Sequence, residues 1–192
     1  MLAVVPREEP ATFDAQVRMP GQKALAENRN PLPRYWGKCL PDLMEAYEYI
    51  CAYSSLRVSP ISGTPTVEHF AAKSSARQLA YEWSNYRLVC ARMNSRKREF
   101  DDVLDPFEIE EGWFELEFLF LQVRPAPGLD ATINKQVERT IRRLKLNDEA
   151  FCSERARWYE AWLSGRIDGT FLREYAPFVH REVVRQGLDG AR

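Results

Sequence analysis

The chain has 192 residues, 45% of them hydrophobic, which suits one compact domain or a small catalytic unit with helical extensions. The formal net charge of −1 excludes a uniformly basic or acidic protein, but the charge is strongly partitioned. Residues 51–98 contain eight Lys and Arg and two acids, whereas residues 101–120 contain eight acids and no base. A surface that meets a polyanion is expected to be basic, so residues 51–98 are the candidate nucleic-acid segment.

The sequence contains no apolar run of membrane-spanning length, and its first residues are too few for a signal peptide. Its four cysteines show no disulfide pattern. We therefore expect a cytoplasmic protein that does not associate with a membrane.

The N-terminal third carries turn signals followed by a helical pattern. Residues 1–34 are rich in proline and polar residues, with turn signals at Pro20-Gly21 and in residues 30–33, and predict an arm wrapped over the domain. Residues 40–53 have apolar residues at helical spacing after Pro41 and predict a helix. We therefore assign residues 1–47 to an N-terminal arm and helix packed on a core.

Residues 66–70 and 86–90 are short runs of β type, and residues 91–100 have the pattern of a helix. The order strand, loop, strand, helix can bring Glu68 and His69 close to Asn94. These are the group types of a one-metal nuclease site, because phosphodiester hydrolysis needs a base for the water and a cation for the phosphate.

Two stretches carry a resemblance to a known family. Residues 67–74 read VEHFAAKS, and residues 83–97 read WSNYRLVCARMNSRK. They resemble the HNH endonucleases, whose fold is a ββα unit that carries a one-metal site. The resemblance implies an α+β protein with an HNH-like ββα-metal nuclease core in residues 48–105.

The resemblance also implies roles for four residues. His69 would be the general base that takes a proton from the attacking water, and Asn85 would orient its imidazole through bonds to the backbone of the loop that carries the histidine. Glu68 and Asn94 would bind one divalent cation. A neutral imidazole suits a base near neutral pH, and oxygen ligands favour Mg²⁺ or Mn²⁺.

Basic residues near these positions are candidate phosphate contacts, because Lys and Arg provide most such contacts. On the predicted helix, the alternative interpretation is an ordinary solvated surface. The candidates for nucleic-acid binding are Lys73, Arg92, Arg96 and Lys97.

The cysteines depart from the family pattern. Many HNH proteins bind a structural zinc with two Cys-x-x-Cys pairs, but here Cys51 and Cys90 each stand without the second cysteine. Two thiolates cannot close a tetrahedral site, so we expect no structural zinc and expect both residues to pack as small hydrophobes. Ala71-Ala72 stands where many relatives have a proline, and Glu68 stands where aspartate or histidine is common.

The C-terminal part has strand patterns followed by helical ones. Residues 105–109 and 113–118 alternate apolar and acidic residues around Gly112, which predicts a small acidic β-hairpin with a solvated acidic face. Residues 131–144 and 149–163 have helical spacing, with a break at residues 146–148. We therefore expect residues 106–192 to form a β-hairpin plus a helical C-terminal region.

The leading hypothesis is a metal-dependent HNH endonuclease that cleaves DNA or RNA. Residues 140–147 also resemble HNH proteins of prokaryotic antiphage systems such as Septu and the retrons, which implies a defence effector with a partner ATPase. One alternative is a degenerate HNH domain that binds nucleic acid or a partner without cutting, and another is a structural subunit with a coincidental pattern. The nucleic acid, the partner, the oligomeric state and the activating signal stay open.

Overall fold

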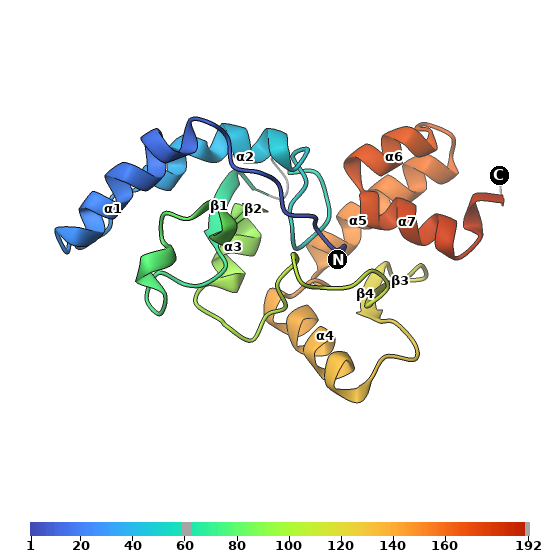
Figure 1. Cartoon of the computed structure of the whole chain (residues 1–192). Coiled ribbons are helices and arrows are strands. Elements are labelled where there is room, and N and C mark those ends of the chain that lie inside the picture. The colour runs from blue at the N-terminus through green and yellow to red at the C-terminus, as the bar shows by residue number, and fades with distance from the viewer. Residues whose placement is uncertain (59–62, 191–192) are drawn as a thin grey trace. The chain divides into compact units, whose positions relative to one another are not determined.

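The computed structural model describes residues 1–58 and 63–190 and has a mixed α+β fold with two small antiparallel sheets (Figure 1). The predicted α+β class is confirmed. Contacts divide the chain into two compact units. We call Val5–Cys51 with Val58–Asp101 the N-terminal unit, and Met1–Val4, Ala52–Arg57 and Asp102–Arg192 the C-terminal unit.

The N-terminal unit combines helices with a strand pair. A π-helical stretch, Asp14–Arg18, continues into α1 (Met19–Ala26), and a 3-10 helix, Tyr35–Cys39, leads into α2 (Leu40–Ala46). Strand β1 (Pro65–His69) pairs antiparallel with β2 (Tyr86–Cys90), and α3 (Ala91–Lys97) follows directly. Both α2 and α3 pack against the strand pair, as Figure 1 shows. The predicted strands are confirmed to within one residue.

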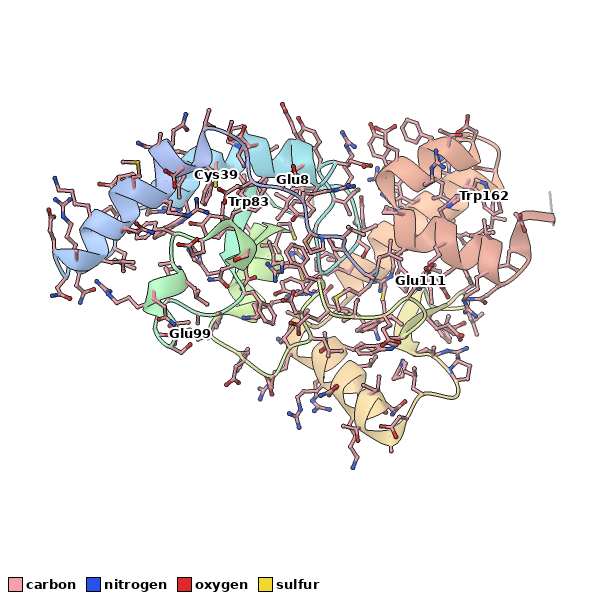
Figure 2. The ribbon with its side chains drawn as sticks, in the orientation of Figure 1. Glu8, Cys39, Trp83, Glu99, Glu111 and Trp162 are labelled. Carbon is pink, nitrogen blue, oxygen red and sulfur yellow. The ribbon has the colours of Figure 1, made fainter. Side chains whose placement is uncertain are left out.

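A single hydrophobic core joins the strand pair to the N-terminal helices. Phe13 packs edge to face on Trp83 and Tyr86, with ring centroids 5.5 and 5.8 Å apart. Cys39 and Trp83, two members of this core, are labelled in Figure 2. Its buried members are Phe13, Val17, Trp36, Cys39, Leu43, Val67, Ala80, Tyr81, Trp83, Tyr86 and Leu88.

The helices of this unit differ in extent from their predictions. Helix α2 ends at Ala46 and not at residue 53, because Glu48 and Tyr49 have φ of 52° and 62°, outside the helical region. Helix α3 ends at Lys97, since Arg98 has φ of 46°. Pro20-Gly21 is no turn but lies in α1, which continues directly from the π-helical stretch Asp14–Arg18.

The C-terminal unit contains a hairpin and a set of helices. Strand β3 (Phe114–Glu117) pairs with β4 (Gln122–Pro125), and α4 (Ala131–Leu144), α5 (Glu149–Leu163), α6 (Gly169–Tyr175) and α7 (Pro177–Arg185) follow. Helices α4 and α5 have the predicted bounds, and Asp130 and Asp148 cap their N-termini. No helix in the described part of the chain is long and apolar enough to cross a membrane.

The hairpin is displaced along the sequence from its predicted place. Residues 105–109 form a turn, because the Asp105 carboxylate accepts from the Phe107 N–H at 3.0 Å and the Asp105 carbonyl accepts from the Glu108 and Ile109 N–H groups. The first predicted strand is therefore absent, and β3 pairs with the later strand β4.

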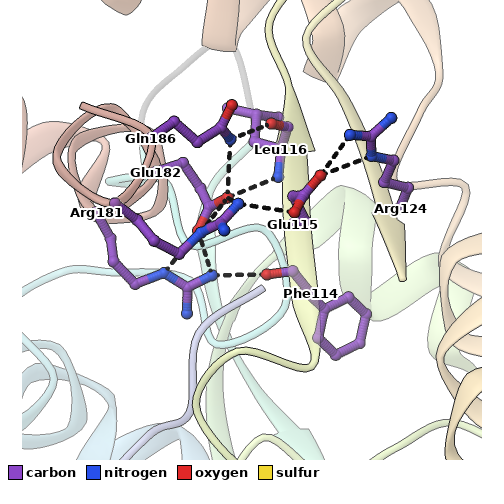
Figure 3. A network of polar contacts seen from close by, with 8 residues as sticks. Phe114, Glu115, Leu116, Arg124, Arg181, Glu182 and Gln186 are labelled. Atoms are coloured by element: carbon purple, nitrogen blue, oxygen red, sulfur yellow. Dashed lines mark hydrogen bonds and ion pairs between the residues drawn. The ribbon is translucent and has the colours of Figure 1, made fainter. Parts of the chain in front are cut away.

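The predicted solvated acidic face is also wrong for β3. Glu115 is 6% exposed, and its carboxylate accepts from Arg124 at 2.9 Å and from Arg185 at 2.8 Å. Glu182, which is fully buried, accepts from the Leu116 N–H and pairs with Arg185, so hydrogen bonds and ion pairs join β3 to α7 (Figure 3). Paired in this way, the carboxylates can be buried without an unbalanced charge.

The position of Gly21 leads to a stability prediction. An added Cβ there would lie 2.1 Å from Cγ of Tyr81, a fully buried residue whose hydroxyl donates to the Pro33 carbonyl. Gly21→Ala should lower the free energy of unfolding by about 2–3 kcal/mol, because displacing the ring outweighs the gain in helix propensity of about 1 kcal/mol. Urea unfolding measures this change. Gly37→Ala is the control, because no atom lies within 4 Å of its added Cβ. Equal stabilities of the two variants would contradict the prediction.

Candidate functional site

A pocket of about 310 Å³ lies in the N-terminal unit at the end of β1. It brings together Glu68, His69 and Asn94, which the sequence places up to 26 residues apart, and it includes Lys73. The lining residues are Arg34, Trp36, Val67, Glu68, His69, Ala72, Lys73, Ser74, Asn94, Arg98 and Glu99.

Strand geometry sends Glu68 and His69 in different directions, because adjacent residues of a strand point to opposite faces. His69 faces the aromatic core, where its ring packs edge to face against Trp36 and Tyr86. The ring centroids are 4.8 Å apart for Trp36 and 5.1 Å apart for Tyr86. Glu68 faces α3, since its carboxylate lies beside Lys97 of that helix. Both residues still reach the pocket, because β1 ends at His69.

The hydrogen bonds of His69 determine which ring nitrogen can act as a base. Nε2 lies 3.0 Å from the Ala80 carbonyl oxygen, which also accepts from the Tyr86 hydroxyl at 2.9 Å. A carbonyl cannot donate, so Nε2 carries the proton and Nδ1 carries the lone pair. Nδ1 lies 3.2 Å from the Lys73 ammonium nitrogen, which donates to it.

Burial keeps this imidazole neutral. His69 is 6% exposed, and its pKa is lowered to about 4, first by burial and second by the positive charge of Lys73. The hydrogen bond to the Ala80 carbonyl acts in the opposite direction and raises the pKa. His69 is therefore uncharged near neutral pH, the form that a general base needs.

Asn85 fastens the loop that follows His69. Its side-chain oxygen accepts from the Ala71 N–H at 2.7 Å, and its side-chain nitrogen donates to the Ala71 and Leu79 carbonyls, both at 3.1 Å. Its own carbonyl accepts from the Phe70 N–H. Asn85 does not line the pocket, and these side-chain bonds are all to backbone groups. Contacts of this kind are what the family resemblance implies.

Glu68 is buried beside an ammonium group. It is 2% exposed, and its Oε1 lies 3.4 Å from Nζ of Lys97, which donates to the Phe70 carbonyl at 2.9 Å. Lys97 is fully buried, so it differs from the surface phosphate contact that the sequence predicts. Its charge balances a buried carboxylate that would otherwise be costly.

Asn94 on α3 completes the set. Its side-chain nitrogen donates to the Thr66 hydroxyl at 3.0 Å, so its oxygen is the atom that can be offered to a cation. A carboxylate and an amide oxygen in one pocket fit Mg²⁺ or Mn²⁺, which bind few protein oxygens and retain several waters. In the described part of the chain, no three His, Cys, Asp or Glu residues gather in a metal-binding arrangement.

The remaining basic candidates divide into two groups. Lys73 lines the pocket, whereas Arg92 and Arg96 are partly exposed on α3 and lie outside the pocket lining. Sequence reasoning missed Arg34 and Arg98, which are exposed and contribute positive charge to the lining. Two further missed lining residues are Trp36 and Glu99, and Glu99 is labelled in Figure 2.

Cys51 and Cys90 lie against each other in the N-terminal unit. Both are buried, and neither takes part in a disulfide. Contact with Cys51 and burial raise the pKa of the Cys90 thiol. Cys51 and Cys90 thus form a packed pair of thiols in this unit.

Comparisons with known proteins add no relative. No model of a protein family matches the chain, and no curated protein matches it significantly. The motif and the geometry of the pocket are therefore the features that indicate a function.

The Asn85 contacts lead to a prediction for the loop. Asn85→Asp keeps the size of the side chain but faces the Ala71 and Leu79 carbonyls with an oxygen, so it should lower the free energy of unfolding by about 2–3 kcal/mol. Urea unfolding measures the loss. Ser84→Ala, at the exposed neighbouring position, should change stability by less than about 0.5 kcal/mol. A stable Asn85→Asp protein would show that the loop does not depend on these bonds.

The lowered pKa of His69 predicts a pH dependence of stability. The unfolded chain binds a proton near the ordinary pKa of 6.5, and the folded chain only near 4, so acid favours unfolding between these values. From about pH 7.5 to pH 5, His69 should lower the free energy of unfolding by about 2 kcal/mol. Above about pH 7.5 it should have almost no effect. Urea unfolding with a chelator present, compared between wild type and His69→Gln, isolates this contribution. Identical pH dependence in the two proteins would rule it out.

Proposed function

We propose that the chain is a metal-dependent endonuclease of the HNH type that hydrolyses phosphodiester bonds. The observation that carries the proposal is the buried His69, which lines one pocket with Glu68 and Asn94. A carbonyl holds its proton on Nε2, so Nδ1 is the basic nitrogen. The strand pair followed by α3 supports assignment of residues 48–105 to a ββα-metal core.

His69 acts as the general base. Nδ1 takes a proton from the water that attacks phosphorus, and the positive imidazolium is stabilised by its Nε2–H donating to the Ala80 carbonyl. Tyr86 donates to the same carbonyl and so fixes its position. Asn85 holds the following loop, which keeps the ring aimed at the pocket.

Glu68 and Asn94 hold the divalent cation, Mg²⁺ or Mn²⁺. A bound cation supplies charge to offset the negative charge that develops on the phosphate. Asn94 is kept in place by its bond to Thr66, and Glu68 by its ion pair with Lys97.

The positive rim favours a polyanionic substrate. Arg34 and Arg98 are exposed at the pocket, and Lys73 lies within it, so flanking phosphates of DNA or RNA meet positive charge. From the resemblance to antiphage nucleases, we further propose that the chain acts in defence with a partner ATPase.

A second candidate function has an observation of its own. A lysine is in contact with each reactive group, Lys97 with Glu68 and Lys73 with His69. An HNH domain whose lysines permanently fill the site would bind nucleic acid or a partner protein without cutting.

Cleavage by the purified chain tests the first proposal. Plasmid DNA and total tRNA are incubated with the protein and Mg²⁺ or Mn²⁺, with and without the partner ATPase. We expect cleavage that falls by about 100-fold or more in His69→Ala, because a positioned general base contributes at least that factor. His180→Ala removes the other histidine of the chain and should leave cleavage unchanged.

Metal binding is measured separately. Mn²⁺ should raise the melting temperature of the wild type and not of Glu68→Gln or Asn94→Ala, because only a folded site binds the ion. Glu45→Gln, which removes an exposed carboxylate on α2, should respond like the wild type. Nucleic-acid binding without cleavage or metal response would instead favour the degenerate binding domain.

A further inference from the structure

Lys73 donates a hydrogen bond to Nδ1 of His69, the nitrogen that must accept a proton in the proposed reaction. Its Nζ lies 3.2 Å from Nδ1 of His69, while Nε2 is held by the Ala80 carbonyl. An imidazole nitrogen has one lone pair and accepts one strong hydrogen bond. As long as Lys73 donates to Nδ1, a water molecule cannot give its proton to that atom.

The surroundings of Lys73 allow its ammonium group to leave. The residue is half-buried in the loop after β1 and lines the pocket. Its Nζ lies 4.9 Å from the centre of the Trp36 ring, a cation–π contact that does not depend on one fixed hydrogen-bond geometry. A lysine side chain turns about four flexible bonds, so the group can move within the pocket without displacing the backbone.

The other basic residues of the site do not have this arrangement. Lys97 is fully buried, paired with Glu68 and bonded to the Phe70 carbonyl. Arg98 bonds back to the Ser95 carbonyl of its own helix. Lys73 is thus the pocket cation that is both in contact with the base and placed to meet a ligand.

We propose that Lys73 determines specificity by coupling phosphate binding to release of His69, a step that rests on the proposed nuclease function. A phosphate group entering the pocket draws the ammonium group away from Nδ1, since a charge-assisted bond to an anion is stronger than a bond to a neutral imidazole. Nδ1 is then open to water. The site is therefore selective for an ester that carries a negative charge, and an uncharged ester leaves the base blocked.

Nitrogen NMR of isotope-labelled histidine tests the coupling without any cleavage. The chain has two histidines, so the spectrum is simple, and the Nδ1 resonance of an imidazole moves when its hydrogen bond is lost. In wild type, inorganic phosphate or dimethyl phosphate at tens of millimolar should shift His69 Nδ1, whereas sodium chloride at equal ionic strength should not. In Lys73→Met without phosphate, the His69 Nδ1 resonance should already lie where phosphate moves it in the wild type. Added phosphate should then leave it unchanged.

Controls keep the result specific. Lys73→Gln repeats the substitution with a polar side chain, and Lys38→Met removes an exposed lysine of the same unit and should behave as wild type. The inference is overturned if phosphate does not shift wild-type Nδ1, or if it shifts Lys73→Met equally. A positive NMR result with no cleavage would overturn the nuclease proposal and leave the coupling intact.

Kinetics add a second readout where cleavage is found. Lys73→Met should raise KM for the polymer by about 10-fold through loss of one phosphate contact. On an uncharged methylphosphonate linkage, the wild type should be inactive and Lys73→Met should gain measurable cleavage. A merely structural role of Lys73 would lower kcat on every substrate, and that outcome overturns the inference.

Discussion

The antiparallel pairing of β1 with β2 is the interaction on which the candidate site depends. The register sets His69 opposite Tyr86, and both side chains donate to the Ala80 carbonyl, which holds the imidazole in one tautomer. Because β2 runs directly into α3, the opposite face of β1 is covered by Asn94 and Lys97, beside Glu68. A register shift of one residue would exchange the two faces and remove every one of these contacts.

The two lysines of the site, Lys97 and Lys73, have different electrostatic roles. Lys97 is fully buried with two partners, so it is a permanent counter-ion, and removing it would leave Glu68 as an unbalanced buried charge. Lys73 is half-buried and donates to a neutral ring, so its place can be taken by another ligand at lower cost. Lys97 is therefore a structural residue of the site, whereas Lys73 acts on the reactivity of His69.

Local patterns predicted the elements that local forces determine. Apolar spacing predicted α4 and α5, and the β-type runs predicted β1 and β2. The displaced hairpin shows the limit, because Asp105 makes a turn with its own side chain and Glu115 finds Arg185, 70 residues away. A period-two pattern of acids does not reveal which of them pairs with a distant arginine. The sequence pattern therefore could not predict that Glu115 is buried.

In the site, too, local sequence predicts some residues, whereas others depend on contacts between distant segments. Motif spacing predicted that Glu68, His69 and Asn94 come together, and all three line one pocket, since they lie within one strand pair and its following helix. It could not name Trp36, whose ring packs against His69 and which lies in residues 1–47, the segment assigned to an N-terminal arm and helix. Because burial is the largest cause of the low pKa of His69, that segment helps to set the basicity of the imidazole. The N-terminal helices are in this sense part of the candidate active site, and the motif alone would not reproduce its chemistry.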